Sequence, residues 1–422
     1  MPALLVSKSP PLSGEVTIHG AKNSVLPILA ATLLCRTPCV LHNCPDILDV
    51  THTRAILHSL GCASERRGAS VYIDPRSCAG HSIPPELAAS MRASSLFLGA
   101  LLARQGEASL SLPGGCPIGA RPVDYHLLAF RALGAEVTET DDTIHCRARR
   151  LTGAKITLPG PSVGATENAM LAAVGAEGGT VIENAACEPE IVDLAGFLTA
   201  CGAKIAGAGT GRVTVKGGQP LTGATYTILP DRIETATFLC ACAACGGTLT
   251  LRRTAPRLAE PVLNSLTESG CRFSCTHDTI QISHDGPLIA CRPVVSKPYP
   301  GFPTDAMPVL LASQLRAEGQ TDFTETIFEN RFGYARELKK LGAQLRQDEN
   351  TVHLRGAPQL YAAQLFAEDL RGGAALVLAA MQAEGESTIF GVKHIERGYD
   401  TLEAALQSVG ARLKTVEIPK KM

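Results

Sequence analysis

The sequence predicts an α/β protein of two domains, each built from three copies of one repeated unit, with helices inside and sheets outside. Three observations predict this architecture. An amphipathic segment that ends in Leu-Gly-Ala, or a close variant, recurs six times at regular spacing. A second helical segment in each copy is apolar on nearly every side. The N-terminal segment matches the strands that the last copy lacks.

The amphipathic segments end in HSLGCA, RALGAE, TACGAK, TESGCR, KKLGAQ and QSVGAR. A glycine at this point is typical of a helix C-cap, because it adopts the left-handed conformation that ends a helix. Successive glycines lie 73, 68, 68, 72 and 68 residues apart, which indicates an internal repeat. The six glycines are Gly61, Gly134, Gly202, Gly270, Gly342 and Gly410.

After each glycine, two short segments alternate between apolar and polar residues, as half-buried strands do. An apolar inner helix follows, and then a strand that leads into the next amphipathic helix. The predicted unit is therefore strand, strand, helix, strand, helix. Helices that are apolar all round belong in a core, so the sheets must lie outside them. The inner helical segments are SVLPILAATLL, SSLFLGALLA, ENAMLAAVGA, TATFLCACAA, MPVLLASQL and GAALVLAAMQ.

The two ends of the chain predict how the units divide into domains. The sixth unit stops after RLKTVE without its second strand, whereas ALLVSKSPPLSGEVTIHG at the N-terminus matches the strands and the PLTG turn of an internal unit. The N-terminal segment should therefore complete the last domain. Three units per domain put the boundary near Leu229-Pro230. We predict residues 22–229 as one domain, and 1–21 with 230–422 as the other.

Composition excludes several classes of function. The 422 residues include 39 basic and 40 acidic side chains, so no net field attracts nucleic acid or a membrane surface. No apolar run approaches the ~18 residues that span a bilayer, and the first residues do not resemble a signal peptide. We expect a cytoplasmic protein whose partners are small molecules, with no nucleic acid bound and no membrane insertion.

Fifteen cysteines are present, but their number is odd and most lie in apolar segments. Reduced thiols that pack as small hydrophobic groups fit this pattern better than disulfides. Cys242 and Cys245 form a CxxC pair, yet a zinc site needs a second pair of ligands at similar spacing, and none is evident. No metal and no cofactor are predicted.

Aligning the units places unexpected polar residues where each inner helix begins, in GAKNS, ASMRAS, PSVGATE, LPDRIE, FPTDAM and AEDLRG. Helix N-termini have unpaired N–H groups and a positive dipole end, so such positions favour anions. N-capping by the aspartates and solvated surface cations is the alternative. Capping does not explain the cations beside apolar helices. The candidates are Lys22, Asn23, Arg92, Asp231, Asp305, Asp369, Arg371 and, in a later loop, Arg397.

The segment PGGCPIGARPVDYH, residues 113–126, is the most distinctive in the chain. Its glycines predict a loop with Cys116 near the tip, outside any apolar or strand pattern. Arg121 would favour the thiolate form of this cysteine, which is the reactive form. The alternative is an exposed, inert loop thiol.

Together these motifs resemble the enolpyruvyl transferases over essentially the whole chain. The match includes GEVTIHGAKN, MRAS, GGCPIGARPVDYH, SVGATENAM, ENAACEPEIVD, LPDRIET, FPTD, FENRF, DLRGGAALVLA and HIERGYD. The cysteine loop is the most specific of them, and it resembles members of the family that use UDP-N-acetylglucosamine in peptidoglycan synthesis. The resemblance implies two inverted α/β domains, of which residues 22–229 carry the cysteine loop, closing over the substrates.

The resemblance also implies which residues bind each substrate. Phosphoenolpyruvate would be held by Lys22, Asn23, Arg92, Arg121, Arg371 and Arg397. UDP-N-acetylglucosamine would be bound by Asn23, Arg92, Arg121, Pro122, Val123, Asp124, Tyr125, Ser162, Val163, Gly164, Asp305 and Ile327.

The chemistry that the resemblance implies is addition of a sugar hydroxyl to phosphoenolpyruvate, followed by loss of phosphate. Asp305 would act as the base and Cys116 as the proton donor, assisted by Lys22 and Arg397. Cys116 would also add covalently to phosphoenolpyruvate and react with the epoxide fosfomycin. Two positions depart from the family pattern: Gly160 stands where a basic residue is common, and Pro117 where a small residue is common.

Two other functions remain open at this point. The sister transferase that acts on shikimate 3-phosphate uses the same phosphoenolpyruvate chemistry, but lacks the GGCxIGARPVD loop. A sugar-nucleotide sensor without catalytic activity would lack Cys116, Lys22 or Asp305, and all three are present.

Overall fold

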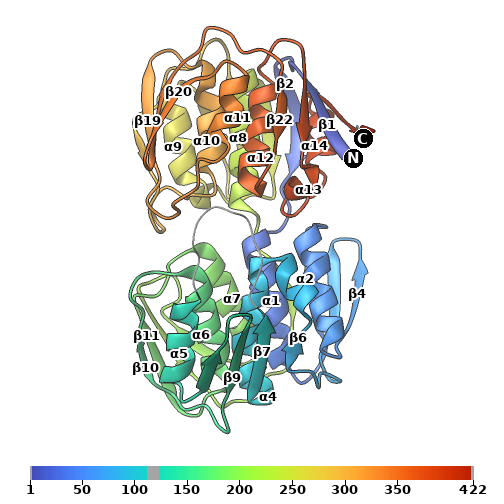
Figure 1. Ribbon diagram of the computed structural model, residues 1–422, viewed down its shortest axis with the longest axis vertical. Coiled ribbons are helices and arrows are strands. Elements are labelled where there is room, and N and C mark those ends of the chain that lie inside the picture. Colours follow the sequence, from blue (N-terminus) through green and yellow to red (C-terminus); the bar gives the residue numbers. More distant parts are fainter. Residues whose placement is uncertain (1, 112–122, 420–422) are drawn as a thin grey trace. The chain divides into compact units, whose positions relative to one another are not determined.

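The structure, a computed structural model, contains six similar groups of elements (Figure 1). It describes residues 2–111 and 123–419. The glycine after each amphipathic helix has φ between 90° and 106°, the left-handed region that suits glycine. The Leu-Gly-Ala signature is thus a helix C-cap in all six repeats. The amphipathic helices are α2 (Leu48–Ser59), α5 (Asp124–Ala132), α7 (Pro189–Ala200), α9 (Glu260–Glu268), α11 (Ala335–Lys340) and α14 (Leu402–Ser408).

The described chain forms two compact units, which we call the first unit, residues 20–111 and 123–229, and the second unit, residues 2–19 and 230–419. Each unit has three four-stranded sheets. In every sheet, an edge strand lies parallel to the strand that follows an inner helix, and an antiparallel pair completes the sheet.

In the first unit, one sheet has the strand order β14 (Thr225–Thr227), β3 (Cys39–His42), β5 (Ser70–Asp74) and β4 (Ala63–Arg67). A second sheet has the order β6 (Ser82–Ile83), β7 (Glu107–Ser111), β9 (Thr143–Arg147) and β8 (Glu136–Glu139). The third has the order β10 (Lys155–Thr157), β11 (Gly179–Glu183), β13 (Arg212–Lys216) and β12 (Lys204–Ala206). In the second unit, one sheet has the strand order β16 (Arg272–Cys275), β17 (Thr279–His284), β15 (Gly247–Arg252) and β2 (Leu12–Thr17). A second sheet has the order β18 (Val294–Val295), β19 (Gln320–Thr324), β21 (Thr351–Arg355) and β20 (Gln344–Asp348). The third has the order β22 (Gln364–Phe366), β23 (Glu386–Phe390), β1 (Pro2–Ser7) and β24 (Arg412–Glu417).

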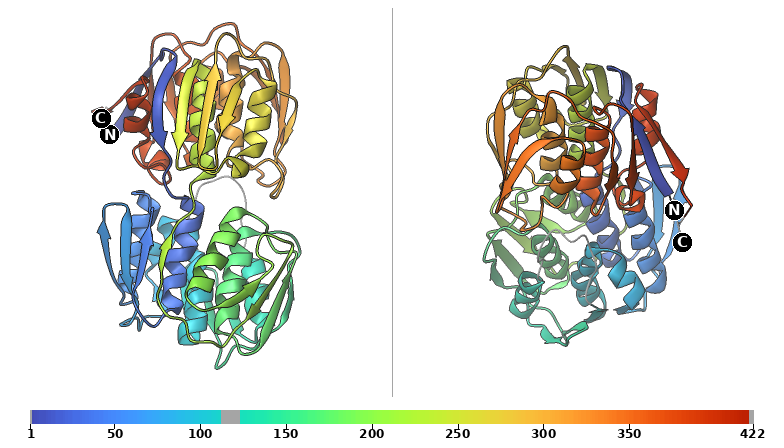
Figure 2. Two further views of the ribbon diagram at one scale, coloured as in Figure 1. Left: turned by 180° about the vertical axis from the view of Figure 1, so that it is seen from behind. Right: turned by 45° about the horizontal axis from the view of Figure 1, so that its top comes forward.

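The inner helices lie inside the sheets of each unit (Figure 2), as predicted from their all-round apolar surface. All residues of α12 are buried, and so are those of α6 from Ala165 to Val174. Each unit has its own hydrophobic core. The inner helices are α1 (Lys22–Ala31), α4 (Phe97–Gln105), α6 (Val163–Gly175), α8 (Arg232–Cys245), α10 (Met307–Ser313) and α12 (Leu370–Ala380).

Shorter helices complete the chain, namely α3 (Pro85–Ser90), α13 (Val392–Ile395) and the 3-10 turns η1 (Thr32–Leu34), η2 (Arg92–Leu96), η3 (Pro256–Leu258) and η4 (Gln314–Arg316). The predicted unit lacked one element, the edge strand before the inner helix. These strands are missing from the prediction because most have only two or three residues, too few for an alternating pattern to show.

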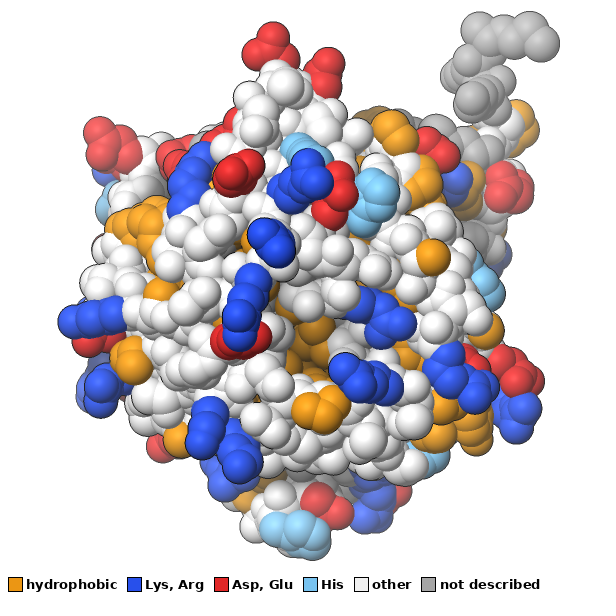
Figure 3. Space-filling model, turned by 90° about the horizontal axis from the view of Figure 1, so that it is seen from below, with side chains coloured by type: hydrophobic (Ala, Val, Ile, Leu, Met, Phe, Trp, Pro, Cys, Tyr) orange, Lys and Arg blue, Asp and Glu red, His pale blue; other side chains and the backbone are white. Residues whose placement is uncertain are grey.

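The N-terminal segment belongs to two sheets of the second unit. Strand β1 lies between β23 and β24 and is antiparallel to both, and β2 lies parallel to β15. Within the described residues, no helix is both long enough and apolar enough to cross a membrane. Basic and acidic side chains are both spread over the face that Figure 3 shows, in keeping with the near-zero net charge.

Candidate active site

The residues that the repeat alignment selected all lie where an inner helix begins. Their positions nevertheless differ, because some are helical, some cap a helix and one precedes the cap. Lys22 is the first residue of α1, Arg92 begins η2, Ser162 caps α6, Asp231 caps α8, Asp305 precedes the cap of α10, and Asp369 caps α12.

Asp231 and Asp369 are N-caps. One carboxylate oxygen of Asp369 accepts hydrogen bonds from the backbone N–H groups of Arg371 and Gly372, both at 3.0 Å. Asp231 does the same for Ile233 at 2.7 Å and Glu234 at 3.0 Å. Both carboxylates thereby satisfy N–H groups that the helix leaves unpaired. The capping alternative is correct for these two aspartates.

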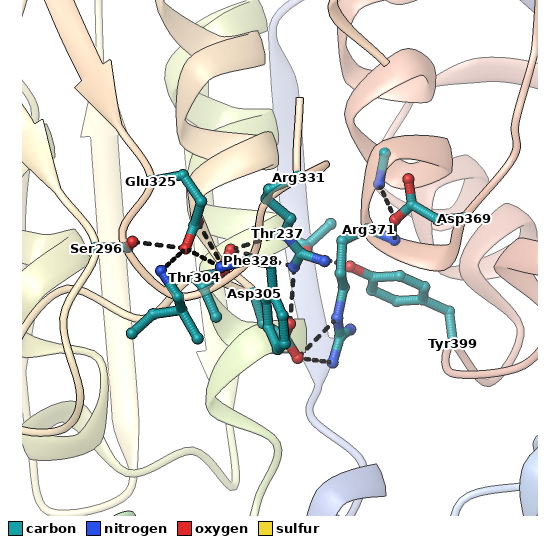
Figure 4. Close-up of polar contacts among 12 residues, drawn as sticks. Thr237, Ser296, Thr304, Asp305, Glu325, Phe328, Arg331, Asp369, Arg371 and Tyr399 are labelled. Atoms are coloured by element: carbon teal, nitrogen blue, oxygen red, sulfur yellow. Dashed lines mark hydrogen bonds and ion pairs between the residues drawn. The ribbon is translucent and has the colours of Figure 1, made fainter. Parts of the chain in front are cut away.

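Asp305 has a different environment, because the α10 N-terminus has no side-chain cap. Its Oδ1 lies 2.7 Å from Nη2 of Arg331, and its Oδ2 lies 3.1 Å from Nη2 of Arg371 (Figure 4). Both arginine side chains are almost fully buried, at 2% and 4% exposure, whereas that of Asp305 is 26% exposed. The carboxylate therefore compensates two buried cations while its side chain stays partly exposed.

Arg371 retains capacity for an anion. Its Nη1 is buried and has no hydrogen-bond partner within the described chain. Burial alone would lower the pKa of Arg371, but the charge of Asp305 offsets this, and the pKa lies above its usual value. The guanidinium lies 5.6 Å from the ring centre of Tyr399, which is also buried. A buried, permanently charged N–H donor without a partner is suited to a carboxylate or phosphate oxygen.

Ile327 lies in the loop after β19 of the same unit. Its side chain is 39% exposed, and its backbone N–H donates to the buried carboxylate of Glu325 at 2.6 Å. Arg397 follows α13 in a turn and is half-buried. The second unit thus contains Asp305, Ile327, Arg371 and Arg397, which the resemblance assigned to substrate binding, and the side chains of Asp305 and Arg371 are in direct contact.

Lys22 pairs with a buried carboxylate in the first unit. Its Nζ lies 2.8 Å from Oδ2 of Asp49 in α2, with the two side chains 12% and 2% exposed. A lysine head group has three donors, and the pair with Asp49 uses one of them. Asn23, the next residue of α1, is half-buried. Sequence reasoning missed Asp49, whose place in an amphipathic helix gives no distinguishing pattern.

His126, which sequence reasoning also missed, is a neutral histidine beside the start of α6. Burial and the nearby charge of Arg92 lower its pKa to about 4. Asn168 accepts the Gly99 N–H through Oδ1, so its Nδ2 donates to Nδ1 of His126 at 2.7 Å. The proton of the neutral ring is therefore on Nε2. A Cβ added to Gly164 would lie 3.4 Å from that nitrogen.

The remaining predicted residues of the first unit surround the starts of α5 and α6. Val123 precedes α5 and is buried, Asp124 is exposed, and Tyr125 is half-buried. Ser162 caps α6 through a 3.4 Å hydrogen bond from the Ala165 N–H, and Val163 and Gly164 follow it. Cys116, Pro117, Arg121 and Pro122 lie outside the described residues.

Gly160 is surrounded by open space, since an added Cβ would have no heavy atom within 4 Å. The position could therefore accept the longer side chain that the family pattern has there. Across residues 2–111 and 123–419, no group of three or more His, Cys, Asp or Glu could hold a metal ion. The cysteines of these residues form no disulfide, and Cys242 and Cys245 have pKa values raised by burial to about 12.

The fold and the described site define a class of protein. The family model described as EPSP synthase (3-phosphoshikimate 1-carboxyvinyltransferase) matches residues 6–406. The chain therefore belongs to the EPSP synthase family of enolpyruvyl transferases. The fold class and the family that the sequence predicted are both confirmed.

Particular members are similar over almost their whole length. UDP-N-acetylglucosamine 1-carboxyvinyltransferase 2 from Caldanaerobacter subterraneus subsp. tengcongensis is 46% identical over 400 residues, which cover 95% of this chain and 96% of the relative. The crystal structure of the enolpyruvyl transferase NikO from Streptomyces tendae has a TM-score of 0.89 and 26% identity, covering 99% of both chains. EPSP synthase from Acinetobacter baumannii has a TM-score of 0.75 at 18% identity, covering 99% of this chain and 100% of that one, a likeness of fold alone.

Proposed function

We propose that the protein transfers the enolpyruvyl group of phosphoenolpyruvate to the 3′-hydroxyl of UDP-N-acetylglucosamine and releases phosphate, the first committed step of peptidoglycan synthesis. One observation carries the chemistry: the partly exposed carboxylate of Asp305 touches Arg371, whose buried Nη1 has no hydrogen-bond partner among the described residues. This arrangement offers a base and an anion-binding cation side by side. The choice of acceptor rests on the 46% identical relative, whose name gives that substrate.

The reaction proceeds by addition and then elimination. Asp305 takes the proton of the sugar hydroxyl as its oxygen bonds to C2 of phosphoenolpyruvate, and C3 gains a proton from Cys116 to become a methyl group. In the second stage the C2–O bond to phosphate breaks and C3 loses a proton, which restores the double bond. Arg371, Arg397 and Lys22 stabilise the charge of the departing phosphate.

The other predicted residues bind the substrates. Asn23, Arg92 and Arg121 contact phosphoenolpyruvate and the sugar nucleotide. The UDP moiety and the sugar are bound by Pro122, Val123, Asp124, Tyr125, Ser162, Val163, Gly164 and Ile327. The division into two domains, residues 22–229 and residues 1–21 with 230–422, is supported by the two compact units of the described chain. We propose that the reaction takes place in the cytoplasm.

A phosphate-release assay with two acceptors tests this proposal. Phosphoenolpyruvate is supplied with UDP-N-acetylglucosamine in one arm and with shikimate 3-phosphate in the other. We expect phosphate release in the first arm only. Release in the second arm alone would make the chain the sister transferase, and release in neither would favour a sugar-nucleotide sensor, provided that UDP-N-acetylglucosamine still binds.

A further inference from the structure

Glu325, the residue after β19, is 2% exposed, yet its carboxylate accepts four hydrogen bonds (Figure 4). Its Oε1 accepts from the Ser296 hydroxyl at 2.8 Å and from the backbone N–H groups of Ile327 at 2.6 Å and Phe328 at 3.1 Å. Its Oε2 accepts from the Thr304 hydroxyl at 2.7 Å. A buried carboxylate is costly unless such donors surround it, and these donors come from three separate segments.

One of these segments holds Asp305. Glu325 binds the side chain of Thr304, the residue directly before the aspartate. Arg331 donates through Nη2 to the backbone oxygen of Thr304 at 3.1 Å and to Oδ1 of Asp305 at 2.7 Å. Thr304 is therefore fixed at both its hydroxyl and its carbonyl. Asp305 cannot move along the loop without breaking one of these contacts.

Another segment presents Ile327. The Ser296 hydroxyl that donates to Glu325 also accepts the Thr326 N–H at 2.8 Å, and the Thr326 hydroxyl donates to the Ser296 carbonyl at 2.5 Å. These bonds join Thr326 to the segment after β18. The neighbouring Ile327 side chain is left 39% exposed, although it is apolar.

We propose that Glu325 is a positioning residue that aligns two parts of the site: the base, through Thr304, and the sugar-nucleotide contact at Ile327, through Ser296. This inference rests on the proposed function, because it assigns Asp305 and Ile327 the roles given there. A carboxylate suits the task, since it is acceptor-only and can bind donors on both oxygens. Small misplacement of a base relative to its substrate lowers turnover steeply.

Separate substitutions remove the hydrogen bond of Glu325 to Thr304 and its hydrogen bond to Ser296. Thr304→Val keeps the shape of the side chain and removes the link to the base, so we expect kcat to fall between about tenfold and a hundredfold with little change in the KM for UDP-N-acetylglucosamine. Thr304→Ser retains the hydroxyl and should restore kcat. Ser296→Ala removes the link to the Ile327 loop and should mainly raise that KM.

Thr324→Val is the matched control. Thr324 is the last residue of β19, directly before Glu325, and its hydroxyl lies 3.0 Å from that of Thr351 in β21. The substitution removes this contact and leaves the hydrogen bonds of Glu325 in place. Melting temperatures show whether each variant is folded, and rates are compared per folded molecule. The positioning role is overturned if Thr304→Val is as active as Thr324→Val, or if Thr304→Ser does not restore kcat. Unaltered protein that releases no phosphate with UDP-N-acetylglucosamine would instead contradict the proposed function.

Discussion

Asp231, Asp305 and Asp369 occupy related places in three repeats, yet their carboxylates have different partners. Two of them bind backbone N–H groups of the following helix, and Asp305 binds two arginine side chains. Asp231 and Asp369 are also buried, whereas the side chain of Asp305 is 26% exposed. Of the three carboxylates, that of Asp305 is therefore the most accessible to a substrate.

Asp305→Asn should lower turnover by at least about a hundredfold per folded molecule, because the amide keeps the shape but cannot take a proton. It should also lower stability, since Arg331 and Arg371 lose their charged partner. Steady-state rates and melting curves separate the two effects. Asp322→Asn, which breaks a pair with His353 in the same unit, is the control. An Asp305→Asn variant with the full rate would exclude the base role.

Cys116 should be the cysteine that fosfomycin alkylates. The described cysteines are mostly buried, and Cys275, which is exposed, has a pKa raised by partial burial and is therefore a poor nucleophile. We expect intact mass to rise by one adduct that maps to Cys116, with phosphoenolpyruvate protecting. Labelling of Cys275 instead would argue against an activated Cys116.

Replacement of Cys116 separates its acid role from its nucleophilic role. Cys116→Asp keeps a group that can donate a proton and should remain active but resist fosfomycin. Cys116→Ser has a hydroxyl that is a poor acid and should be nearly inactive. A fully active serine variant would contradict the proton-donor assignment.

Some residues around Asp305 could be predicted from the sequence, and others could not. Asp305 and Arg371 could be found because each stands at the start of an apolar helix, where the repeat alignment makes a charged side chain conspicuous. Arg331 and Glu325 could not, because they lie in loops without a period, and only the fold brings them to Thr304 and Asp305.

The inner helices differ in how their N-termini are capped. An all-apolar helix gains stability from burial on every side but leaves its first N–H groups unpaired, so its N-terminus needs a cap or a ligand. In α8 and α12 an aspartate is the cap, and in α6 it is Ser162. In α1 and α10 no side chain caps the helix.

Asp369→Ala should destabilise the second unit by about 1 kcal/mol, because two helix N–H groups lose their acceptor. That corresponds to a fall in melting temperature of about 2–4 °C for a domain of this size. Asp369→Asn retains an acceptor oxygen and should lose less. Equal stability of the alanine variant and the unaltered protein would show that the cap contributes nothing.

His126, a residue of α5 beside the start of α6, should make the free energy of unfolding depend on pH. Its pKa is about 4 in the folded chain, compared with 6.5 ordinarily, so between these values the unfolded chain binds a proton that the folded chain does not. The free energy of unfolding should therefore fall as pH decreases from 6.5 to 4. His126→Gln removes this contribution, and its stability should depend less steeply on pH in that window. Identical slopes for the two proteins in chemical denaturation would contradict a neutral His126.

For the whole molecule, the repeat is what made the fold predictable. The sequence has a repeat period near 70 residues, six capping glycines and all-apolar inner helices. Together these features predict that helices lie inside the sheets and that the N-terminal strands join the sheets of the second unit. The five edge strands of two or three residues escaped prediction because their pairing partners, not their own residues, define them. In the first unit β14 joins β3 across more than half of that unit's sequence, a contact that no local pattern encodes.

The most direct test of the proposed reaction is to run it in D₂O with phosphoenolpyruvate and UDP-N-acetylglucosamine and to examine the products by mass spectrometry and NMR. Addition converts C3 into a methyl group before elimination, so we predict a sugar nucleotide that carries one enolpyruvyl ether at the 3′-oxygen, with deuterium at C3. Formation of that ether without deuterium would contradict addition–elimination. No ether at all, from folded protein with both substrates present, would contradict the proposed transfer.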